Sequence, residues 1–212
     1  MRTSQLIDAL AADRSRRSLS LEARFCLALG AGALVSAGLF FATIGPRPDF
    51  AAAAHTMRFD MKFVDTLALA LPSAIFAWRL LRPDARPGAV ALSLLAPFVL
   101  LGAAVAVELM VVPADLWRTR LIGSNAMHCM TIIPLLSIAP LGALLIVMRE
   151  GAPQNPWISG ALAGAAAAGI AATLYASNCP DDSPLFVASW YPLATLIVVA
   201  AGAWAGDRLL RW

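Results

Sequence analysis

The sequence predicts an all-α fold: a polytopic membrane protein in which six transmembrane helices form a bundle. Of the 212 residues, 60% are apolar and 14% are charged, whereas soluble domains average about 45–50% and about 25%. The apolar residues also form runs as long as the roughly 20 residues that a helix needs to cross a bilayer. We expect the six spans at about residues 25–44, 63–81, 88–112, 126–147, 157–177 and 185–206.

The basic residues predict the orientation of this bundle, because connections rich in Arg and Lys remain in the cytoplasm. Eleven lie before the first span, between spans two and three, between spans four and five, or in the tail. The other connections hold five: Arg47, Arg58, Lys62, Arg118 and Arg120. We therefore expect both termini in the cytoplasm. The net charge of +3 reflects this bias, and we predict no direct contact with nucleic acid.

A cleaved signal peptide is the alternative interpretation of the first span. The run AAAA at 51–54 resembles a cleavage site. However, the apolar run before it is longer than the roughly 7–15 residues of a signal sequence. We favour an uncleaved anchor.

Residues 1–24 form the one sizeable water-facing segment with helical patterning. Leu6, Ile7 and Leu10 share one face at helical spacing, and Asp8 lies early, where a negative charge suits the helix dipole. Such a short amphipathic helix is marginal alone in water. It would gain stability by packing its apolar face on a partner or on the membrane surface, and the sequence leaves both interpretations open.

Several residues interrupt or mark the predicted spans. Small residues at Gly160 and Gly164 predict that the fifth span is central or tightly paired, because they let helix backbones approach. Glu108 is the one carboxylate well inside an apolar run, and we expect it to pack or to reach the nearby interface. Helix-breaking prolines lie in four spans, at Pro72, Pro97, Pro134, Pro140 and Pro192.

Two cysteines lie at matching depths in a predicted helical hairpin. Cys129 begins span four, Cys179 follows span five, and each is 25 residues from residue 154 in the connecting turn. In an antiparallel hairpin, equal distances from the turn mean equal depth. By the charge bias that depth is the outer face, where disulfides persist. The spacing permits the thiols to meet, and Cys26 is expected to be a small buried residue.

Polar neighbours surround the two thiols in sequence. His128 precedes Cys129, while Asp181 and Asp182 follow Cys179 within NCPDDS. A histidine near a thiol favours thiolate, and a Cys, Cys, His and Asp set could transiently hold a soft metal at Cys129 and Cys179. The aspartates could equally satisfy backbone groups of the turn. Redox or metal chemistry and a static bridge or coincidence both remain open at this point.

The chain resembles the NrsF-type family of bacterial membrane proteins at three places. SQLIDALAAD is similar to the start of that family, HCMTIIPLLSIAPLGALLIVMREGAP to its fourth span, and NCPDDSPLFVASWYPLA through DRLLRW to its last span and tail. With six spans in matching order, the resemblance covers nearly the whole chain.

The resemblance implies a non-enzymatic anti-sigma factor of the bacterial inner membrane. Its partner would be an extracytoplasmic-function sigma factor, held by residues 1–24 through Leu6, Ile7, Asp8 and Leu10. Cys129 and Cys179 would sense oxidants or heavy metals, with His128, Asp181 and Asp182 in the same motifs. Residues 25–212 would form the membrane domain, and no cofactor is expected. The oligomeric state is left open.

Two other classes of protein fit the sequence less well. A transporter would need repeated spans with paired midplane charges, and the predicted spans carry none. A membrane thiol oxidoreductase would need a second cysteine pair or a CxxC, and with three scattered cysteines the chain has neither.

Overall fold

The computed structural model describes residues 19–82 and 88–211, and this part of the chain is helical without strands. Six of its helices are long and apolar enough to cross a membrane. They correspond to α2 (Leu21–Thr43), α4 (Met57–Arg79), the segment Ala91–Val111 that contains α6 (Ala96–Val111), the segment Ala114–Met148 that contains α8 (Ala126–Met148), α9 (Pro156–Ala176) and α10 (Pro184–Leu209). The predicted all-α fold with six apolar helices is confirmed. The predicted amphipathic helix, with Leu6, Ile7, Asp8 and Leu10, lies outside the described residues.

Shorter elements complete the described chain. The connection after α2 holds α3 (Phe50–Ala53), and the connection after α6 holds the 3₁₀ turn η1 (Ala114–Leu116) and α7 (Trp117–Ile122). The predicted third span is two helices, since α5 (Gly88–Ser93) ends before α6 begins. Pro97 in the first turn of α6 accounts for the break, because it lacks the amide hydrogen that would bond one turn back and its ring clashes with the carbonyl there. The other prolines named above lie inside continuous helices.

Helix α9 lies at the centre of the bundle and packs against α10, α4, α8 and α2. Glycines allow the closest of these contacts. A Cβ atom at Gly160 would lie 2.2 Å from the carbonyl oxygen of Gly202, and one at Gly164 would lie 2.7 Å from that of Val198. The predicted central or tightly paired fifth span is therefore confirmed, with α10 as its closest neighbour.

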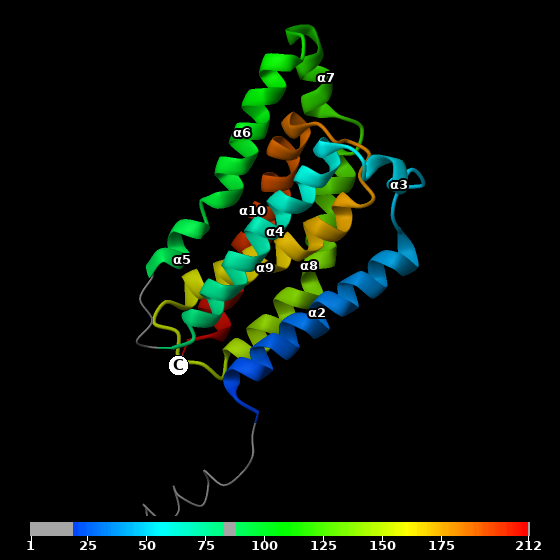
Figure 1. The fold of residues 1–212 in the computed structure, drawn as a ribbon. Helices are drawn as coiled ribbons and strands as arrows, with labels where there is room; N and C mark the ends of the chain where they lie inside the picture. Colours follow the sequence, from blue (N-terminus) through cyan, green and yellow to red (C-terminus); the bar gives the residue numbers. More distant parts are fainter. Residues whose placement is uncertain (1–18, 83–87, 212) are drawn as a thin grey trace, which may run out of the picture.

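Helix α2 packs lengthwise against α8 (Figure 1). Near the middle of α2, a Cβ atom at Gly32 would lie 2.5 Å from the Cα of Pro140. One turn further along, the buried Ser36 hydroxyl donates a 2.6 Å hydrogen bond to the carbonyl of Leu136. The two helices are thus in backbone contact halfway along α2.

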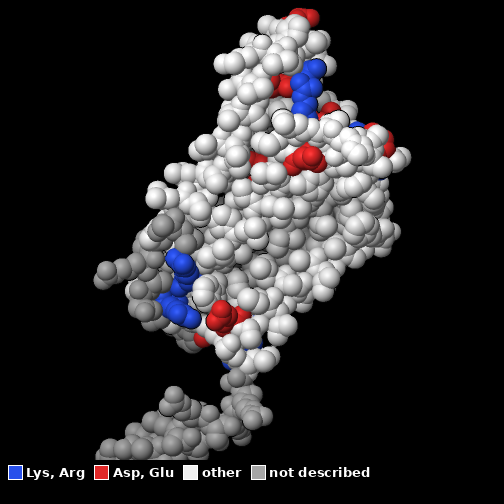
Figure 2. Space-filling model, in the orientation of Figure 1, with Lys and Arg blue, Asp and Glu red and all other residues white. Residues whose placement is uncertain are grey.

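The bundle has two polar ends. Figure 2 shows the basic and acidic side chains of one face gathered toward these ends, with a broad band of other residues between them. One end contains the ion pair between Arg24 and Glu150, close to the chain's carboxyl terminus (Figure 1). The opposite end, called the thiol end below, consists of residues 44–56, 112–125 and 177–183. This distribution of charge indicates a multi-pass membrane protein.

Candidate functional site

The structure brings Cys129 and Cys179 into one buried cluster at the thiol end. Cys129 lies in the first turn of α8, and Cys179 lies in the 177–183 loop between α9 and α10. Both side chains are 0% exposed, both are free thiols, and they pack in one cluster with Tyr175, Phe186 and Tyr191. Neither cysteine side chain therefore has surface that water or a dissolved reagent contacts directly in this conformation.

Asp181 joins the 177–183 loop to the start of α8. Its Oδ2 accepts hydrogen bonds from the backbone amides of Ser124 and Asn125, at 3.0 and 2.9 Å. A carboxylate in this position satisfies amides at a helix amino terminus and interacts favourably with the helix dipole. The bond to Asn125 also brings the loop within one helical turn of Cys129, because the Cys129 amide donates to the Asn125 carbonyl. Asp181 therefore holds the two segments that bear the thiols next to each other.

Gly123 makes this junction possible. Its φ angle is +59°, in the region that favours glycine, and a Cβ atom there would lie 2.3 Å from the Phe186 ring and 2.9 Å from the Asp181 carboxyl carbon. Any other residue at this position would separate the loop from α8.

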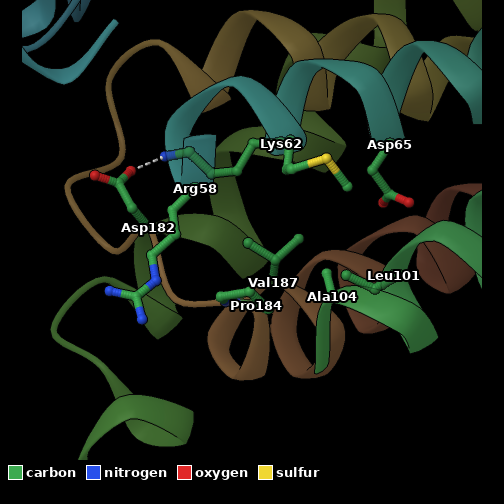
Figure 3. A pocket seen from close by; sticks show the side chains of 9 residues that line it. Arg58, Lys62, Asp65, Leu101, Ala104, Asp182, Pro184 and Val187 are labelled. Atoms are coloured by element: carbon green, nitrogen blue, oxygen red, sulfur yellow. Dashed lines mark ion pairs between the residues drawn. The ribbon is translucent and has the colours of Figure 1, made fainter. Parts of the chain in front are cut away.

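Asp182 joins the same loop to α4 and to the connection that follows α2. Its carboxylate lies 2.6 Å from Nζ of Lys62 and 2.9 Å from Nη1 of Arg47. Figure 3 shows the Lys62 side chain extending from α4 to Asp182. The Lys62 ammonium also donates a 2.8 Å hydrogen bond to the carbonyl of Cys179. Since Lys62 is 2% exposed, this is a buried, charge-assisted contact with the backbone of a cysteine.

The connection after α2 also makes direct contacts with the loop. The Arg47 amide donates to the Ser177 carbonyl at 3.0 Å, and the Asn178 side chain donates to the Gly45 carbonyl at 2.9 Å. Arg47 also pairs with Asp49 at 2.6 Å. Hydrogen bonds and ion pairing with Asp49 and Asp182 raise the pKa of the Arg47 guanidinium. Its positive charge is accordingly permanent.

Glu108 forms a second ion cluster beside the first. The carboxylate is 3% exposed and lies 2.6 Å from both Arg58 and Arg120, while Ser183 donates to it at 3.2 Å. Of the two expectations for Glu108, packing agrees with its burial, and two arginines that are 45% and 32% exposed pair with its charge. The cluster holds α4, α6 and α7 against the start of α10.

The electrostatic surroundings of Cys179 disfavour thiolate. Burial raises the pKa of its thiol, and the nearby Lys62 charge opposes this effect only partly. Since the thiolate is the reactive form, the buried thiol has low reactivity toward oxidants and metals. Opening of the 177–183 loop would expose the Cys179 thiol to water and so remove the burial that raises its pKa.

His128 lies away from the thiol cluster, although it is adjacent to Cys129 in sequence. Its side chain is exposed whereas that of Cys129 is buried, because consecutive helical residues point about 100° apart. Within residues 19–82 and 88–211, no group of three or more His, Cys, Asp or Glu side chains is placed to hold a metal ion. Cys26 is exposed on α2, which corrects the expectation that it is buried; the core-facing residue there is Phe25.

Sequence reasoning missed Lys62 and Arg47 as neighbours of the cysteines. From the sequence, these two residues contribute only to the charge of the outer connections. One signal was available for Lys62, which is the chain's one lysine and is followed at once by the apolar pattern of α4. Nothing in the sequence links residue 62 to residues 179 and 182.

Comparisons with known proteins give a consistent result. A family model described as "NrsF: Negative regulator of sigma F" matches residues 10–212. The chain is 33% identical to a probable anti-sigma-F factor NrsF of Azospira oryzae, over 100% of both chains. It is 32% identical to the anti-sigma-F factor NrsF of Caulobacter vibrioides, again over 100% of both chains. No solved structure matches the chain.

Proposed function

The chain belongs to the NrsF family of negative regulators of sigma F, and we propose that it is an inner-membrane anti-sigma factor that responds to thiol-reactive stress. Residues 1–24 bind an extracytoplasmic-function sigma factor in the cytoplasm and withhold it from RNA polymerase. Cys129 and Cys179 are the sensing pair. The similarity to anti-sigma-F factors supports the anti-sigma role, and the sensing role is our inference.

One observation carries the sensing proposal: Cys129 of α8 and Cys179 of the 177–183 loop pack in one buried cluster, and ion pairs hold that loop in place. If the cysteines were only core residues, apolar packing would be enough to bury them. Instead, charged side chains hold the loop that bears Cys179 in place; they are Lys62, Arg47, Asp181 and Asp182. These contacts make the thiols accessible only when the loop opens. A closed loop over reduced thiols is one state, and an open loop with modified thiols is the other.

Two chemical signals could act on the cysteine pair. An oxidant takes two electrons while the two thiols release two protons and form one S–S bond. Alternatively, a thiophilic divalent cation displaces the two protons and binds both sulfurs. By the chain-entropy model a bridge over a loop of this length constrains the chain by roughly 3–4.7 kcal/mol. Only about 1–3 kcal/mol of coupling is needed for a roughly 5–150-fold change in affinity for the sigma factor.

The proposed orientation of the chain rests on the distribution of its basic residues. The thiol end and the first two turns of α4 together carry five basic residues, and the opposite connections and termini carry eleven; the positive-inside rule then favours a thiol end outside the cytoplasm. There an oxidising environment reaches the loop, while residues 1–24 face the sigma factor on the other side of the membrane.

The sensing proposal is tested with cysteine variants. Cys129→Ser and Cys179→Ser, singly and together, should abolish the rise in sigma-dependent transcription after oxidant or cadmium, and Cys26→Ser is the matched control that should respond normally. A full response in the double variant would overturn the sensing role and leave the anti-sigma role intact.

The binding proposal is tested separately. Leu6→Asp or Leu10→Asp should release the sigma factor without any signal, because a carboxylate removes the apolar face that docks into a groove. Co-purification of the sigma factor is the readout, and membrane levels of the variant are measured in parallel. Capture at the wild-type level would overturn the assignment of residues 1–24 as the binding segment.

A further inference from the structure

The two cysteines at the thiol end are held in different ways. Cys129 lies in the first turn of α8, where its backbone amide takes part in the helical hydrogen bonds. Cys179 lies in the 177–183 loop, which the side chains of Asp181 and Asp182 fasten to the start of α8 and to α4. Opening of this loop breaks side-chain contacts but leaves the backbone bonds of α8 intact. It therefore brings Cys179 into contact with water and leaves Cys129 within the bundle.

The two sulfurs also differ in their hydrogen-bonding surroundings. The hydroxyls of Tyr175 and Tyr191 interact with the Cys179 sulfur as hydrogen-bond donors. Neither hydroxyl has an oxygen or nitrogen partner among the described residues. Around Cys129, the described residues provide charged groups but no comparable donor. The two hydroxyls are thus placed to stabilise negative charge on the Cys179 sulfur, or on an oxygen attached to it.

Burial of the cluster limits what an oxidised Cys179 can carry when it returns to Cys129. Both cysteines and Tyr175 are 0% exposed, and Tyr191 is 4% exposed. A closely packed interior has no space for a bulky adduct such as a mixed disulfide with glutathione. A sulfenic acid adds a single oxygen atom, and this oxygen accepts hydrogen bonds of the kind that the two tyrosine hydroxyls leave unused. The cluster therefore suits a sulfenic acid, which is the product of a thiolate and a hydroperoxide.

We propose that Cys179 reacts first with a hydroperoxide and that Cys129 then resolves the product into a disulfide. In the open loop, the Cys179 thiolate attacks one peroxide oxygen and the O–O bond breaks. The sulfur loses two electrons and becomes a sulfenic acid, while the other oxygen takes up the proton that the thiol had released and leaves as water or an alcohol. Only Cys179 takes this step, because Cys129 stays buried when the loop opens.

The second step takes place when the loop returns toward α8. The Cys129 sulfur attacks the Cys179 sulfur, the thiol proton of Cys129 is released, the S–O bond breaks and an S–S bond forms. The leaving hydroxide combines with that proton and departs as water, and the hydroxyls of Tyr175 and Tyr191 stabilise its negative charge as it leaves. The two steps together consume one molecule of hydroperoxide for each disulfide. This order rests on the proposed sensing role of the cysteine pair, to which it adds the sequence of events.

The order of reaction is tested in purified full-length protein in a Cys26→Ser background, with hydrogen peroxide as the oxidant and dimedone as the trap for sulfenic acid. Peptide mass spectrometry locates and quantifies the dimedone adduct. In Cys129→Ser the sulfenic acid has no resolving thiol, so the adduct should accumulate on Cys179. In the matched Cys179→Ser variant, the adduct on Cys129 should form about tenfold more slowly, because that thiol belongs to a helix that does not open with the loop. With both thiols present, a disulfide should replace most of the adduct.

Two results would overturn this order. One is a dimedone adduct that forms on Cys129 in Cys179→Ser as fast as on Cys179 in Cys129→Ser. The other is the absence of an adduct on Cys179 in folded Cys129→Ser, with Cys129→Ala used should the serine variant fail to fold. Neither result bears on the sensing role itself, which depends on the transcriptional response of the same variants.

Tyrosine variants test the part played by the two hydroxyls. Tyr175→Phe and Tyr191→Phe keep the rings but remove the donors. The double variant should slow conversion of the sulfenic acid to the disulfide by about tenfold or more, while oxidation of Cys179 continues at the wild-type rate. The matched control Ile133→Val changes packing in the same cluster without removing a donor, and should leave both rates unchanged. Equal slowing in the control, or wild-type conversion in the double phenylalanine variant, would overturn the role of the hydroxyls.

Discussion

Replacing Lys62 by Met should release the loop that covers the cysteines. Methionine preserves most of the apolar length of the lysine side chain but removes the ammonium. The contact of 2.6 Å with Asp182 and the hydrogen bond of 2.8 Å to the Cys179 carbonyl are both lost. The closed loop is then held by fewer bonds, while the open loop, in contact with water, is little affected.

The structure bounds the size of this effect. Removing one member of a fully buried ion pair costs about 3–5 kcal/mol, but here Asp182 is 22% exposed and retains Arg47 at 2.9 Å. A charge-assisted hydrogen bond contributes about 1.5–3 kcal/mol. We therefore expect a loss of about 2–3 kcal/mol, which corresponds to a roughly 30–150-fold increase in the open fraction.

The assay is the rate at which a maleimide labels Cys179 in purified protein, measured by peptide mass spectrometry in a Cys26→Ser background. Labelling takes place from the open loop, in which the thiol is hydrated, so its rate follows the open fraction. The matched control is Arg118→Met, since Arg118 is an exposed basic residue at the same end and its removal should leave the rate unchanged.

Two results would refute this reasoning. The first is a rate that changes less than about fivefold in Lys62→Met. The second is additivity of Lys62→Met and Asp182→Asn, because partners in one ion pair must show a coupling energy of about 0.5 kcal/mol or more in a double-mutant cycle.

Three further predictions concern packing, buried charge and pH. Gly160→Leu should lower the free energy of unfolding by about 3 kcal/mol, because the added side chain forces α9 away from α10. The control Gly142→Leu has open space around its Cβ position and should change this free energy by less than about 1 kcal/mol. Thermal unfolding in detergent compares the two variants. Glu108→Gln should cost about 2–3 kcal/mol in the same assay by removing two charge-assisted hydrogen bonds, and an unchanged midpoint would contradict this. Since burial raises the pKa of Cys179, its alkylation should reach half its maximal rate above the usual thiol pKa of about 8.5, and a midpoint at or below that value would be inconsistent with the closed loop.

The membrane-length helices were predictable from the sequence because the thickness of the bilayer sets the number of apolar residues that each needs. A span has to cross about 30 Å of hydrocarbon, so runs of apolar residues predict α4 or α9 without knowledge of their neighbours. The break before α6 was harder to place, because Pro97 and Pro134 look alike in sequence. The chain ends a helix before Pro97 and continues through Pro134.

The side-chain contacts at the thiol end depend on tertiary structure and could not be derived by counting residues. Counting gives depth along a helix, and it gave Cys129 and Cys179 similar depths. Rotation about the helix axis is set by the neighbouring helices, which is why His128 faces outward while Cys129 is buried. Lys62 and Asp182 meet because α4 packs on α9, across 120 residues of chain.

A rotation of α2 about its backbone contact with α8 would move the two ends of the helix in opposite directions. Gly32 and Ser36 fix its midpoint, and with 23 residues the helix extends about 17 Å to either side at about 1.5 Å per residue. One arm ends at Gly45 and Arg47, which are bonded to the loop that carries Cys179; the other leads back to residues 1–18. A turn of 10° about that pivot would displace the two tips by about 3 Å in opposite directions. Movement at one face of the membrane would thus be inverted at the other, without any helix having to slide.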